Sequence, residues 1–529
     1  MKIGVINTGG TISCVGVPLG PMTAAEFAQG CNAILNPVFA SQFPDLDITY
    51  VTDLEFPASK TKTLDSTNLQ PTDWCLLADY ILKHYERFDA WVVLHGTDSM
   101  DVTGTALPFL LSTFDGNAMA TAVLSKPVIL TGSQLPLFRQ DAPSRPLTLN
   151  FNTDAFQNLC GAVAAAQTGI ADVCVYFQNK LYRACRVRKT NATEIDAFSS
   201  PNHPKLGTFG AGLALRNEHC LPGPASEDVS LDNPGVRAAA RAQLAFVQAN
   251  IDKFPVMRLS AFPAAYDGEA ATAYIADLID ACMAQGTKGL VLEGYGAGNF
   301  PSGNADNPAL GAICKALKTA NDAGVCIVDC TQVLAGTVHN GTYAAGAWLP
   351  DAGALSAVDM TPVAAFAKTM ILLSAAAHPA NGWSLDTVKT LVRSNLLGEM
   401  KSTSRLDSRS NASLLSGQSI AALDGSATLT NHPAQGPVLT DSRNKDVVLW
   451  RALNALGEQD LPGRLTMQSD GNLVFLSRSN KVLWQTNTQV SSKGASQLIL
   501  NGSLADASLS LAVFNYTANT VAKVLYPAD

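Results

Sequence analysis

The sequence predicts two α/β units with mostly parallel sheets, followed by an all-β region. Through about the first 400 residues, apolar runs typical of buried parallel strands alternate with helical patterns. Beyond residue 413 no cysteine occurs, helical periodicity stops, and short strands with polar turns take over. The 529 residues also exceed what one hydrophobic core organises. We expect a first unit at 1–215, a connector at 216–255, a second unit at 256–398, a linker at 399–413 and the all-β region at 414–529.

The first unit opens with a short apolar strand at 2–7. A helix is expected at 23–35, where Thr23 can cap its first turn. Another helix begins at Pro71, because proline in a first turn loses no hydrogen bond. Further strands are expected at 47–54, 90–94, 127–130 and 173–177, with a hairpin at 179–180 leading to 186–189. Strands and helices that alternate in this way predict a parallel sheet with right-handed crossovers.

The second unit is a smaller domain of the same class, joined to the first by a connector that contains a helix at 236–249. Strands are expected at 289–293 and 325–329, and helices at 363–377 and 385–397. The 363–377 segment is rich in alanine, is interrupted by Lys368 and is too short to cross a bilayer. It therefore predicts a buried helix.

The all-β region contains an internal repeat. Residues 441–450 (DSRNKDVVLW) are echoed by residues 477–484 (SRSNKVLW), and a weaker third copy is expected at 498–526. Repeated short strands predict a symmetric module built from one unit. Trp450 and Trp484, at the ends of the first two copies, are expected to belong to its core.

The composition excludes several functional classes. A net charge of −8 argues against a nucleic-acid partner. The seven histidines show no ligand spacing, so we expect no metal. The eleven cysteines lack C-x-x-C pairs and no secretory signal precedes the first strand, which together favour reduced thiols in a cytoplasmic protein without a membrane anchor.

The turn after the first strand carries the first candidate reactive group. Gly9 and Gly10 let the backbone turn tightly, and Thr11 follows at the carboxyl end of the strand, where open α/β sheets place ligands. The G-x-G-x-x-G spacing is absent, so a dinucleotide site is not expected. A threonine hydroxyl is a weak nucleophile and needs a base to attack an amide.

Other strand-end segments could supply the partners of this hydroxyl. Lys189 could act as a base through Thr97, and Asp98 could hold either this lysine or a substrate ammonium. Ser66, flanked by Asp65 and Thr67, could bind a carboxylate. Taken singly, each has an ordinary alternative: a helix cap, a turn former, or a solvated basic patch at Arg186, Arg188 and Lys189. Their concurrence at strand ends favours amide or ester chemistry with a threonine nucleophile.

Residues 8–12 (TGGTI) and 95–98 (HGTD) resemble the two signature motifs of the bacterial-type L-asparaginase family, and most closely its cytoplasmic type I branch. The resemblance runs from residue 1 to about residue 395. It includes 126–136 (KPVILTGSQLP), 182–189 (YRACRVRK), 295–299 (YGAGN) and 329–332 (DCTQ). It implies the two-domain asparaginase-type fold and hydrolysis of L-asparagine to L-aspartate and ammonia through an acyl-threonine.

The resemblance also implies roles for individual residues. Thr11 matches the family's nucleophile, and Thr97, Asp98 and Lys189 match its second triad. Asp65, Ser66 and Thr67 match the segment that binds the substrate α-carboxylate. Asn299 matches a residue that reaches the site from a neighbouring subunit, which implies a dimer or a tetramer assembled from dimers. No metal or organic cofactor is implied.

One family feature is missing. The family places a tyrosine on the loop after the nucleophile, whereas no tyrosine occurs here between Thr11 and Thr49. Another residue could activate Thr11, catalysis could be slow, or the substrate could differ. The alternatives are a glutaminase or another ω-amidase, a relative of the tRNA-dependent amidotransferase subunit, and a catalytically weak carbohydrate-binding or sensor protein.

The carboxyl-terminal repeat resembles the bulb-type, mannose-binding lectin domain, which implies a β-prism. Gln468, Asp470, Asn472 and Val474 match its sugar-binding motif, and Leu476 replaces the motif's final tyrosine. The resemblance implies one pocket for a mannose-type sugar at most, with a structural or oligomerising role as the alternative.

Overall fold

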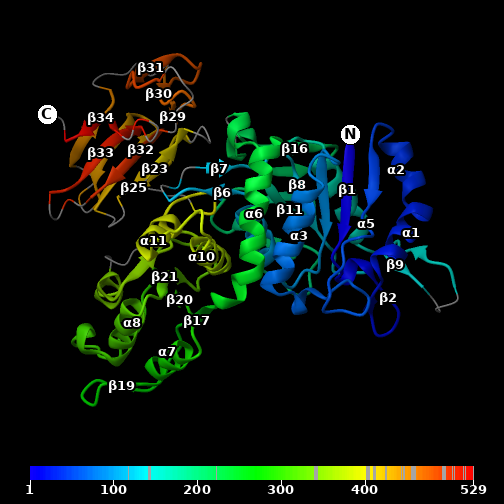
Figure 1. Ribbon diagram of the computed structural model, residues 1–529, viewed down its shortest axis with the longest axis horizontal. Coiled ribbons are helices and arrows are strands. Elements are labelled where there is room, and N and C mark those ends of the chain that lie inside the picture. The colour runs from blue at the N-terminus through cyan, green and yellow to red at the C-terminus, as the bar shows by residue number, and fades with distance from the viewer. Residues whose placement is uncertain are drawn as a thin grey trace.

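The structure is a computed structural model (Figure 1). It describes residues 1–116, 118, 120–140, 145–221, 223–224, 226–338, 343–400, 405–408, 413–422, 426–442, 444, 447–453, 460–490, 496–502, 504, 507–515, 518 and 520–527.

An eight-stranded sheet forms the centre of the first unit. Its strands, in spatial order, are β16 (Leu213–Leu215), β15 (Gly207–Phe209), β12 (Lys180–Arg183), β11 (Val173–Phe177), β8 (Val128–Thr131), β5 (Ala90–Leu94), β1 (Lys2–Asn7) and β4 (Asp47–Tyr50). The strands from β11 to β4 run parallel, while β12, β15 and β16 are antiparallel additions. The expected mostly parallel sheet is confirmed, and β5 and β11 have the predicted bounds.

Helices cover both faces of this sheet. They are α1 (Ala24–Ile34), α2 (Asn36–Gln42), α3 (Pro71–Lys83), α4 (Met100–Leu110) and α5 (Ala155–Ala166), while α6 (Pro234–Asn250), the helix expected in the connector, packs on α3 and α10 (Pro362–Ala376). Buried residues of α3, α4 and α6 form one core cluster with the sheet, and those of α1, α2 and α5 form another. The predicted cap is confirmed, since the Thr23 hydroxyl accepts the Glu26 N–H while the Glu26 carboxylate accepts the Thr23 N–H. Helix α3 begins at Pro71 as expected.

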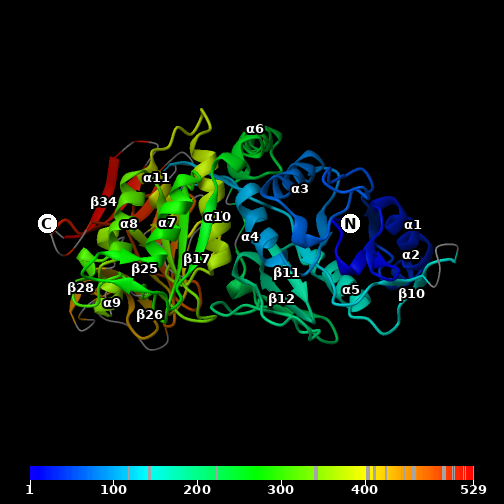
Figure 2. The same ribbon diagram turned by 90° about the horizontal axis from the view of Figure 1, so that it is seen from below.

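The second unit has a four-stranded parallel sheet in the order β17 (Val256–Ser260), β20 (Gly289–Gly294), β21 (Cys326–Thr331) and β22 (Ala354–Ser356). Its helices are α7 (Tyr274–Ala284), α8 (Ala312–Asp322), α9 (Ala344–Ala347), α10 (Pro362–Ala376) and α11 (Leu385–Arg393). Helix α10 is buried as predicted, and its residues join core clusters of both units. In two views it lies with α6 between the two units (Figures 1 and 2).

Short elements complete the two units. The two-stranded pairs are β2 (Cys14–Val15) with β3 (Gly20–Pro21), β6 (Thr113–Phe114) with β7 (Ala120–Ala122), β9 (Phe138–Arg139) with β10 (Thr148–Leu149), β13 (Arg188–Lys189) with β14 (Phe198–Ser199), and β18 (Tyr266–Asp267) with β19 (Thr272–Ala273). The 3₁₀ turns are Thr11–Ser13, Ser66–Asn68, Ala184–Arg186, Asn217–His219, Glu227–Val229, Ile251–Lys253, Pro308–Leu310 and Pro350–Ala352.

A buried ion pair ends helix α11 earlier than predicted. The Lys368 Nζ donates to the Glu399 carboxylate at 2.5 Å, and both side chains are fully buried. The same amine donates to the backbone carbonyls of Val392 and Ser394, which draws the chain out of helical geometry after Arg393. The segment 394–400 therefore lies in the protein interior rather than extending the helix to residue 397.

The all-β region consists of three four-stranded antiparallel sheets around one apolar core. They are β24 (Ser413–Leu414), β29 (Arg464–Met467), β30 (Leu473–Leu476) and β31 (Val482–Gln485); β25 (Ser419–Ala421), β26 (Ala427–His432), β27 (Gly436–Asp441) and β28 (Val448–Arg451); and β23 (Arg405–Asp407), β32 (Ser496–Asn501), β33 (Ser510–Asn515) and β34 (Thr520–Tyr526). The two clear repeat copies place Trp450 and Trp484 on the outer strands of two sheets, where both pack on the core and their ring centroids lie 5.6 Å apart. The weaker third copy corresponds to the third sheet.

The structure departs in two places from the linker expected at 399–413. Glu399 is fully buried in its ion pair, and β23 pairs with β32 while Leu406 enters the apolar core. The polar composition gave no indication of strand β23, because alternate side chains of an edge strand face outward. Residues 401–404 and 409–412 lie outside the described residues.

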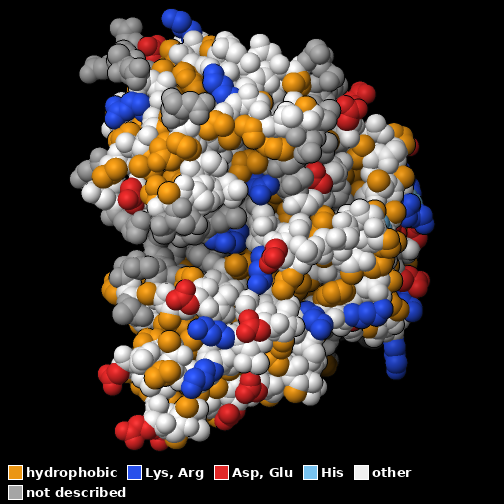
Figure 3. Space-filling model, turned by 60° about the vertical axis from the view of Figure 1, so that its left-hand side comes forward, with side chains coloured by type: hydrophobic (Ala, Val, Ile, Leu, Met, Phe, Trp, Pro, Cys, Tyr) orange, Lys and Arg blue, Asp and Glu red, His pale blue; other side chains and the backbone are white. Residues whose placement is uncertain are grey.

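Surface character agrees with the modest net charge. Figure 3 shows Lys and Arg side chains interspersed with Asp and Glu over one face, while hydrophobic side chains gather over its upper part, where the all-β region lies. Within the described parts of the chain, no helix combines the length and apolarity needed to cross a membrane.

We predict that Glu399→Ala lowers the free energy of unfolding by about 3–5 kcal/mol, because it leaves the buried Lys368 ammonium without a counter-charge. Denaturant unfolding followed by circular dichroism measures the change. As a control, Asp196→Ala removes the ion pair between the exposed Asp196 and the half-buried Lys180, and should cost less than about 1 kcal/mol. Equal losses in the two variants would contradict the prediction.

Candidate active site

The turns after neighbouring parallel strands leave the first sheet at one edge. Asn7 at the end of β1 is paired with Leu94 at the end of β5, which is itself paired with Thr131 of β8. The N–H of Thr8 donates to the Leu94 carbonyl at 3.0 Å, and the N–H of Leu64 donates to the Thr8 carbonyl at 2.7 Å. The turns that carry Thr11, Thr97 and the 65–67 segment are thereby brought together.

These turns touch through positions that have no side chain. Gly10 has a φ of 81°, and a Cβ atom there would collide with the backbone of Gly96. A Cβ on Gly96 would collide with the Ser66 side chain, and one on Gly132 with the carbonyl oxygen of His95. Because most of the obstructing atoms are backbone, even alanine would force the turns apart.

Lys189 lies against the second of these turns. Its Nζ donates to the Thr97 Oγ1 at 2.9 Å and to the Asp98 carboxylate at 2.6 Å. The Lys189 side chain is 18% exposed and that of Asp98 is 56% exposed, so this carboxylate is open to a ligand. Of the predicted residues, the structure therefore joins Thr97, Asp98 and Lys189 directly.

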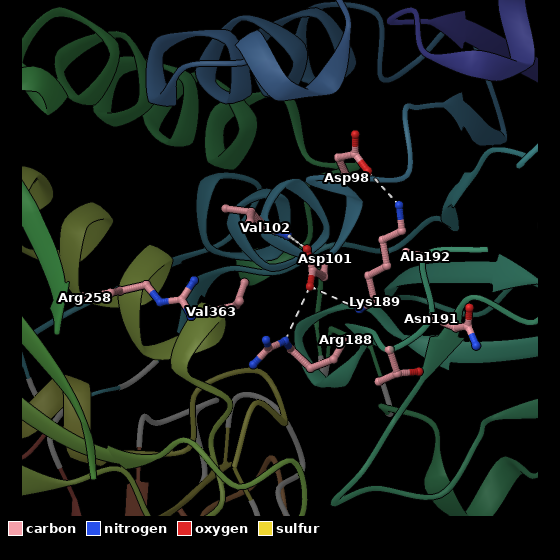
Figure 4. A pocket seen from close by; sticks show the side chains of 10 residues that line it. Asp98, Asp101, Val102, Arg188, Lys189, Asn191, Ala192, Arg258 and Val363 are labelled. Carbon is pink, nitrogen blue, oxygen red and sulfur yellow. Dashed lines mark hydrogen bonds and ion pairs between the residues drawn. The ribbon is translucent and has the colours of Figure 1, made fainter. Parts of the chain in front are cut away.

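The segment that carries Lys189 differs from expectation. The lysine lies on β13, in a separate two-stranded pair, rather than at the end of a parallel strand. Its backbone N–H donates to the Asp101 carboxylate at 3.2 Å, an anchor that the sequence analysis missed (Figure 4). Burial raises the pKa of Asp101, while the Lys189 N–H and the charge of Arg188 oppose that rise. Asp101 stands three residues after Asp98, close enough to the second motif to have been suspected.

The solvated basic patch considered as an alternative for this segment is wrong for Arg186. Its side chain is 2% exposed and pairs with Asp359 at 2.7 Å. It also donates to the backbone carbonyl of Glu399 at 2.7 Å. The second unit therefore holds the strand that presents Lys189.

The 65–67 segment forms the third side of the site. Asp65 caps a 3₁₀ turn by accepting the N–H of Thr67 at 3.0 Å and its hydroxyl at 2.9 Å. Ser66 is buried beside Gly96, and its carbonyl accepts the Ser99 hydroxyl at 2.6 Å. Asp65 and Thr67 are exposed, so their polar atoms are accessible from solvent.

Thr11 begins a 3₁₀ turn and is half-buried. Among the described residues, no side chain shares a hydrogen bond with its hydroxyl. The following β2–β3 hairpin contains Cys14, whose thiol donates to the Gly10 carbonyl at 3.2 Å, and the exposed Val17 and Leu19. Burial, together with the nearby Asp65 charge, raises the pKa of Cys14 to about 11, so its thiol stays protonated.

His95, the first residue of the second motif, is fully buried under the site. Its Nδ1 lies 2.7 Å from the Gly96 carbonyl oxygen and its Nε2 lies 2.9 Å from the Thr103 hydroxyl. Burial lowers the pKa of His95 to about 4, although the hydrogen bond to Gly96 opposes the fall. The imidazole is therefore neutral at physiological pH.

A cavity of about 510 Å³ adjoins Asp98 and Lys189 (Figure 4). Its opposite wall belongs to the second unit and includes Arg258 of β17 and Val363 of α10. Arg258 is held by the Glu293 carboxylate at 2.7 Å. In the part of the chain that the structure describes, no group of three or more His, Cys, Asp or Glu side chains could hold a metal ion.

Two groups of predicted site residues lie elsewhere. Asn299 is in the turn after β20 of the second unit, where its backbone exchanges two hydrogen bonds with Tyr295. The 468–474 motif spans the turn between β29 and β30 of the all-β region. There the Asn472 side chain bonds Gln485 and Thr486 and is buried, while Gln468 and Asp470 remain accessible.

Comparison with known proteins agrees with this arrangement. Residues 2–220 match the family profile "Asparaginase, N-terminal", and residues 271–381 match "Glutaminase/Asparaginase C-terminal domain". L-asparaginase 1 of Escherichia coli K12 is 31% identical over 400 residues, which are 75% of this chain and 98% of that protein. The chain belongs to the asparaginase family.

Two further relatives support the same assignment. The L-asparaginase of Thermococcus kodakarensis is 27% identical over 402 residues, 76% of this chain and 99% of that protein. The crystal structure of L-asparaginase I from Vibrio cholerae superposes with a TM-score of 0.54 at 29% identity, covering 75% of this chain and 98% of that one. The matched family profiles both end before the all-β region.

We predict that Gly96→Ala lowers kcat/KM for L-asparagine at least about 100-fold, because the added methyl must displace Ser66 or the Gly10 turn. Steady-state kinetics with purified protein test this. Gly210→Ala is the matched control, since a Cβ there meets no atom within 4 Å. An active Gly96→Ala enzyme would show that the turns tolerate separation.

Proposed function

We propose that this chain hydrolyses L-asparagine to L-aspartate and ammonia, with Thr11 as the nucleophile. The observation that carries the proposal is the contact of the Lys189 amine with Thr97 and Asp98, on a turn that packs directly against the Gly10 turn. The named L-asparaginases among the relatives favour asparagine over the other amides considered.

In the first half of the reaction the Thr11 oxygen attacks the side-chain amide carbon of asparagine. An ester bond forms, the carbon–nitrogen bond breaks, and the hydroxyl proton leaves with the nitrogen as ammonia. Water then adds to the ester, releasing aspartate and returning a proton to Thr11. The two half-reactions together consume one water molecule.

The Lys189–Thr97 pair serves the proton transfers. Thr97 accepts a hydrogen bond from the Lys189 Nζ, so its hydroxyl can pass a proton between the amine and the reacting centre. Asp98 keeps the amine in place and is exposed enough to pair with the substrate ammonium as well. The polar 65–67 segment, across Gly96 from this pair, is suited to bind the α-carboxylate.

We predict that Thr11→Ala lowers ammonia release from asparagine about 10³-fold or more, since it removes the nucleophile. Lys189→Ala should lower kcat about 10²–10⁴-fold because it removes the base. A coupled ammonia assay with asparagine and glutamine measures both. Lys180→Ala, which alters another lysine paired with an aspartate, should retain full activity.

The assay also separates the alternatives. Faster turnover of glutamine would favour the ω-amidase alternative, and an active Thr11→Ala enzyme would exclude the acyl-threonine mechanism. Absence of turnover with both amides would leave a binding or sensor role.

We also propose that a second copy of the chain docks on the second unit. Exposed aromatic and aliphatic side chains occur in the segments that follow its strands: Phe262 after β17, Tyr295 after β20, and Val333 and Leu334 after β21. Gathered apolar exposure of this kind is typical of protein interfaces. Docking there would carry Asn299, next to Tyr295 in the same turn, toward the site of the partner.

We predict that Val333→Asp reduces the oligomer to monomers, because a charge in an apolar interface is left unpaired. Light scattering coupled to gel filtration measures the mass. Val524→Asp is the matched control: Val333 is 50% exposed on the second unit, and Val524 is 49% exposed on the all-β region. A Val333→Asp protein that keeps the wild-type mass would place the interface elsewhere.

For the all-β region we propose the β-prism architecture and weak binding of a mannose-type sugar. Asp470 is exposed and Gln468 half-buried on one turn, so both can reach sugar hydroxyls. The Asn472 amide is already used by Gln485 and Thr486, which removes one polar group from the motif. We therefore expect lower affinity than a complete motif provides.

We predict retention on mannose-agarose that is lost in Asp470→Ala. Lys481→Ala, which alters the neighbouring β30–β31 hairpin, should be retained like the wild type. No retention of the wild-type protein would favour the structural role of this region.

A further inference from the structure

His95 is a buried, titratable side chain that the proposed reaction does not use. It immediately follows β5 and precedes the Gly96–Thr97–Asp98 turn. Both of its ring nitrogens have partners, the Gly96 carbonyl and the Thr103 hydroxyl. Because both nitrogens are engaged, the ring is held in one orientation.

The partners also determine which nitrogen carries the proton. A carbonyl oxygen only accepts, so Nδ1 donates its hydrogen to Gly96. Because the neutral ring carries one hydrogen, Nε2 accepts the hydroxyl hydrogen of Thr103. Thr103 thus selects the tautomer that can hold the turn.

The Gly96 carbonyl belongs to the peptide that leads into Thr97. Among the described contacts, the His95 ring supplies the hydrogen bond to this carbonyl, and Gly96 is buried between Gly10 and Ser66. Without the ring, a buried carbonyl would lack a partner, and rotation of its peptide would relieve the cost. The Thr97 hydroxyl would move with that peptide.

The first turn of α4 ties this anchor to the lysine. Thr103 holds His95, and Asp101 of the same turn accepts the backbone N–H of Lys189. One rigid helix start therefore sets the positions of both Thr97 and Lys189. Their 2.9 Å hydrogen bond depends on the two anchors together.

We propose that His95 is a positioning residue: its Nδ1–H holds the Gly96 carbonyl and so keeps the Thr97 hydroxyl within reach of Lys189. The inference rests on the proposed function, because it concerns the same proton-transfer pair.

Two amide substitutions separate positioning from simple packing. In His95→Asn the amide nitrogen lies near the place of Nδ1 and can still donate to Gly96. In His95→Gln it lies near the place of Nε2 and leaves that carbonyl unpaired. Packing alone predicts the opposite order, because asparagine leaves the larger cavity.

We expect His95→Gln to lower kcat for asparagine about 30–100-fold with KM changed less than about 3-fold, as one lost buried hydrogen bond implies. His95→Asn should stay within about 5-fold of the wild-type kcat. Equal activity of both variants and the wild type, or a weaker His95→Asn than His95→Gln, would overturn the inference.

A second pair of variants tests the positioning role of His95 if the His95 variants do not fold. Thr103→Ser keeps the hydroxyl and should leave kcat nearly unchanged. Thr103→Val keeps the shape but removes the hydroxyl, and should lower kcat about 10-fold at unchanged KM. A fully active Thr103→Val would overturn the inference.

Failure of the proposed function itself is recognised separately. Lys189→Ala is measured beside these variants, with thermal unfolding as the check on folding. If Lys189→Ala is as active as the wild type, the proposed proton-transfer pair is wrong. If Lys189→Ala is inactive while His95→Gln is fully active, only the positioning role is wrong.

Discussion

The candidate site depends on close contact between backbones at the edge of the first sheet. Gly10 touches Gly96, and Gly96 touches Ser66, with no space for a methyl group between them. This contact places the turn of the proposed nucleophile against the turn of the proposed relay. The parallel pairing of β1 with β5 brings the two turns to the same edge of the sheet. They can touch there because Gly10 and Gly96 have no side chains.

A second set of contacts holds the lysine on the other side. Asp101 bonds the Lys189 backbone, and Arg186 joins the same short segment to Asp359 and to the carbonyl of Glu399. Glu399 in turn is held by Lys368 of α10, the helix between the two units. The second unit therefore supports the geometry of the first in addition to lining the adjacent cavity.

Much of this fold could be predicted because local patterns agreed with the final structure. Continuous apolar runs marked β5 and β11, and Thr23 and Pro71 marked helix starts. Prediction failed where the conformation or burial of a segment depends on partners far away in the sequence. The burial of Arg186 requires Asp359, which is 173 residues away, and the residues around Leu406 became a strand because β32 pairs with them.

The residues of the candidate site could also be predicted only in part. The motif containing Thr97 and Asp98 and the position of Lys189 pointed to residues that the structure joins. The role of Asp101 depends on a backbone N–H, and the hydrogen bonds of the Asn472 side chain depend on Gln485 at the end of β31 and on Thr486 just after it. The position of Asp101, three residues after Asp98, is the one hint in the sequence, whereas the hydrogen bonds of Asn472 leave no sign in residue type or spacing.

The β2–β3 hairpin beside the site is built differently from the turns beneath it. Val17 and Leu19 are exposed, and a Cβ on Gly20 would meet no atom within 4 Å. Larger side chains at these three positions would therefore extend into solvent, whereas a methyl group on Gly10 or Gly96 would collide with the neighbouring turn. A change in the amide that the site accepts could therefore be made at the tip of this hairpin without separating the turns that meet through glycine.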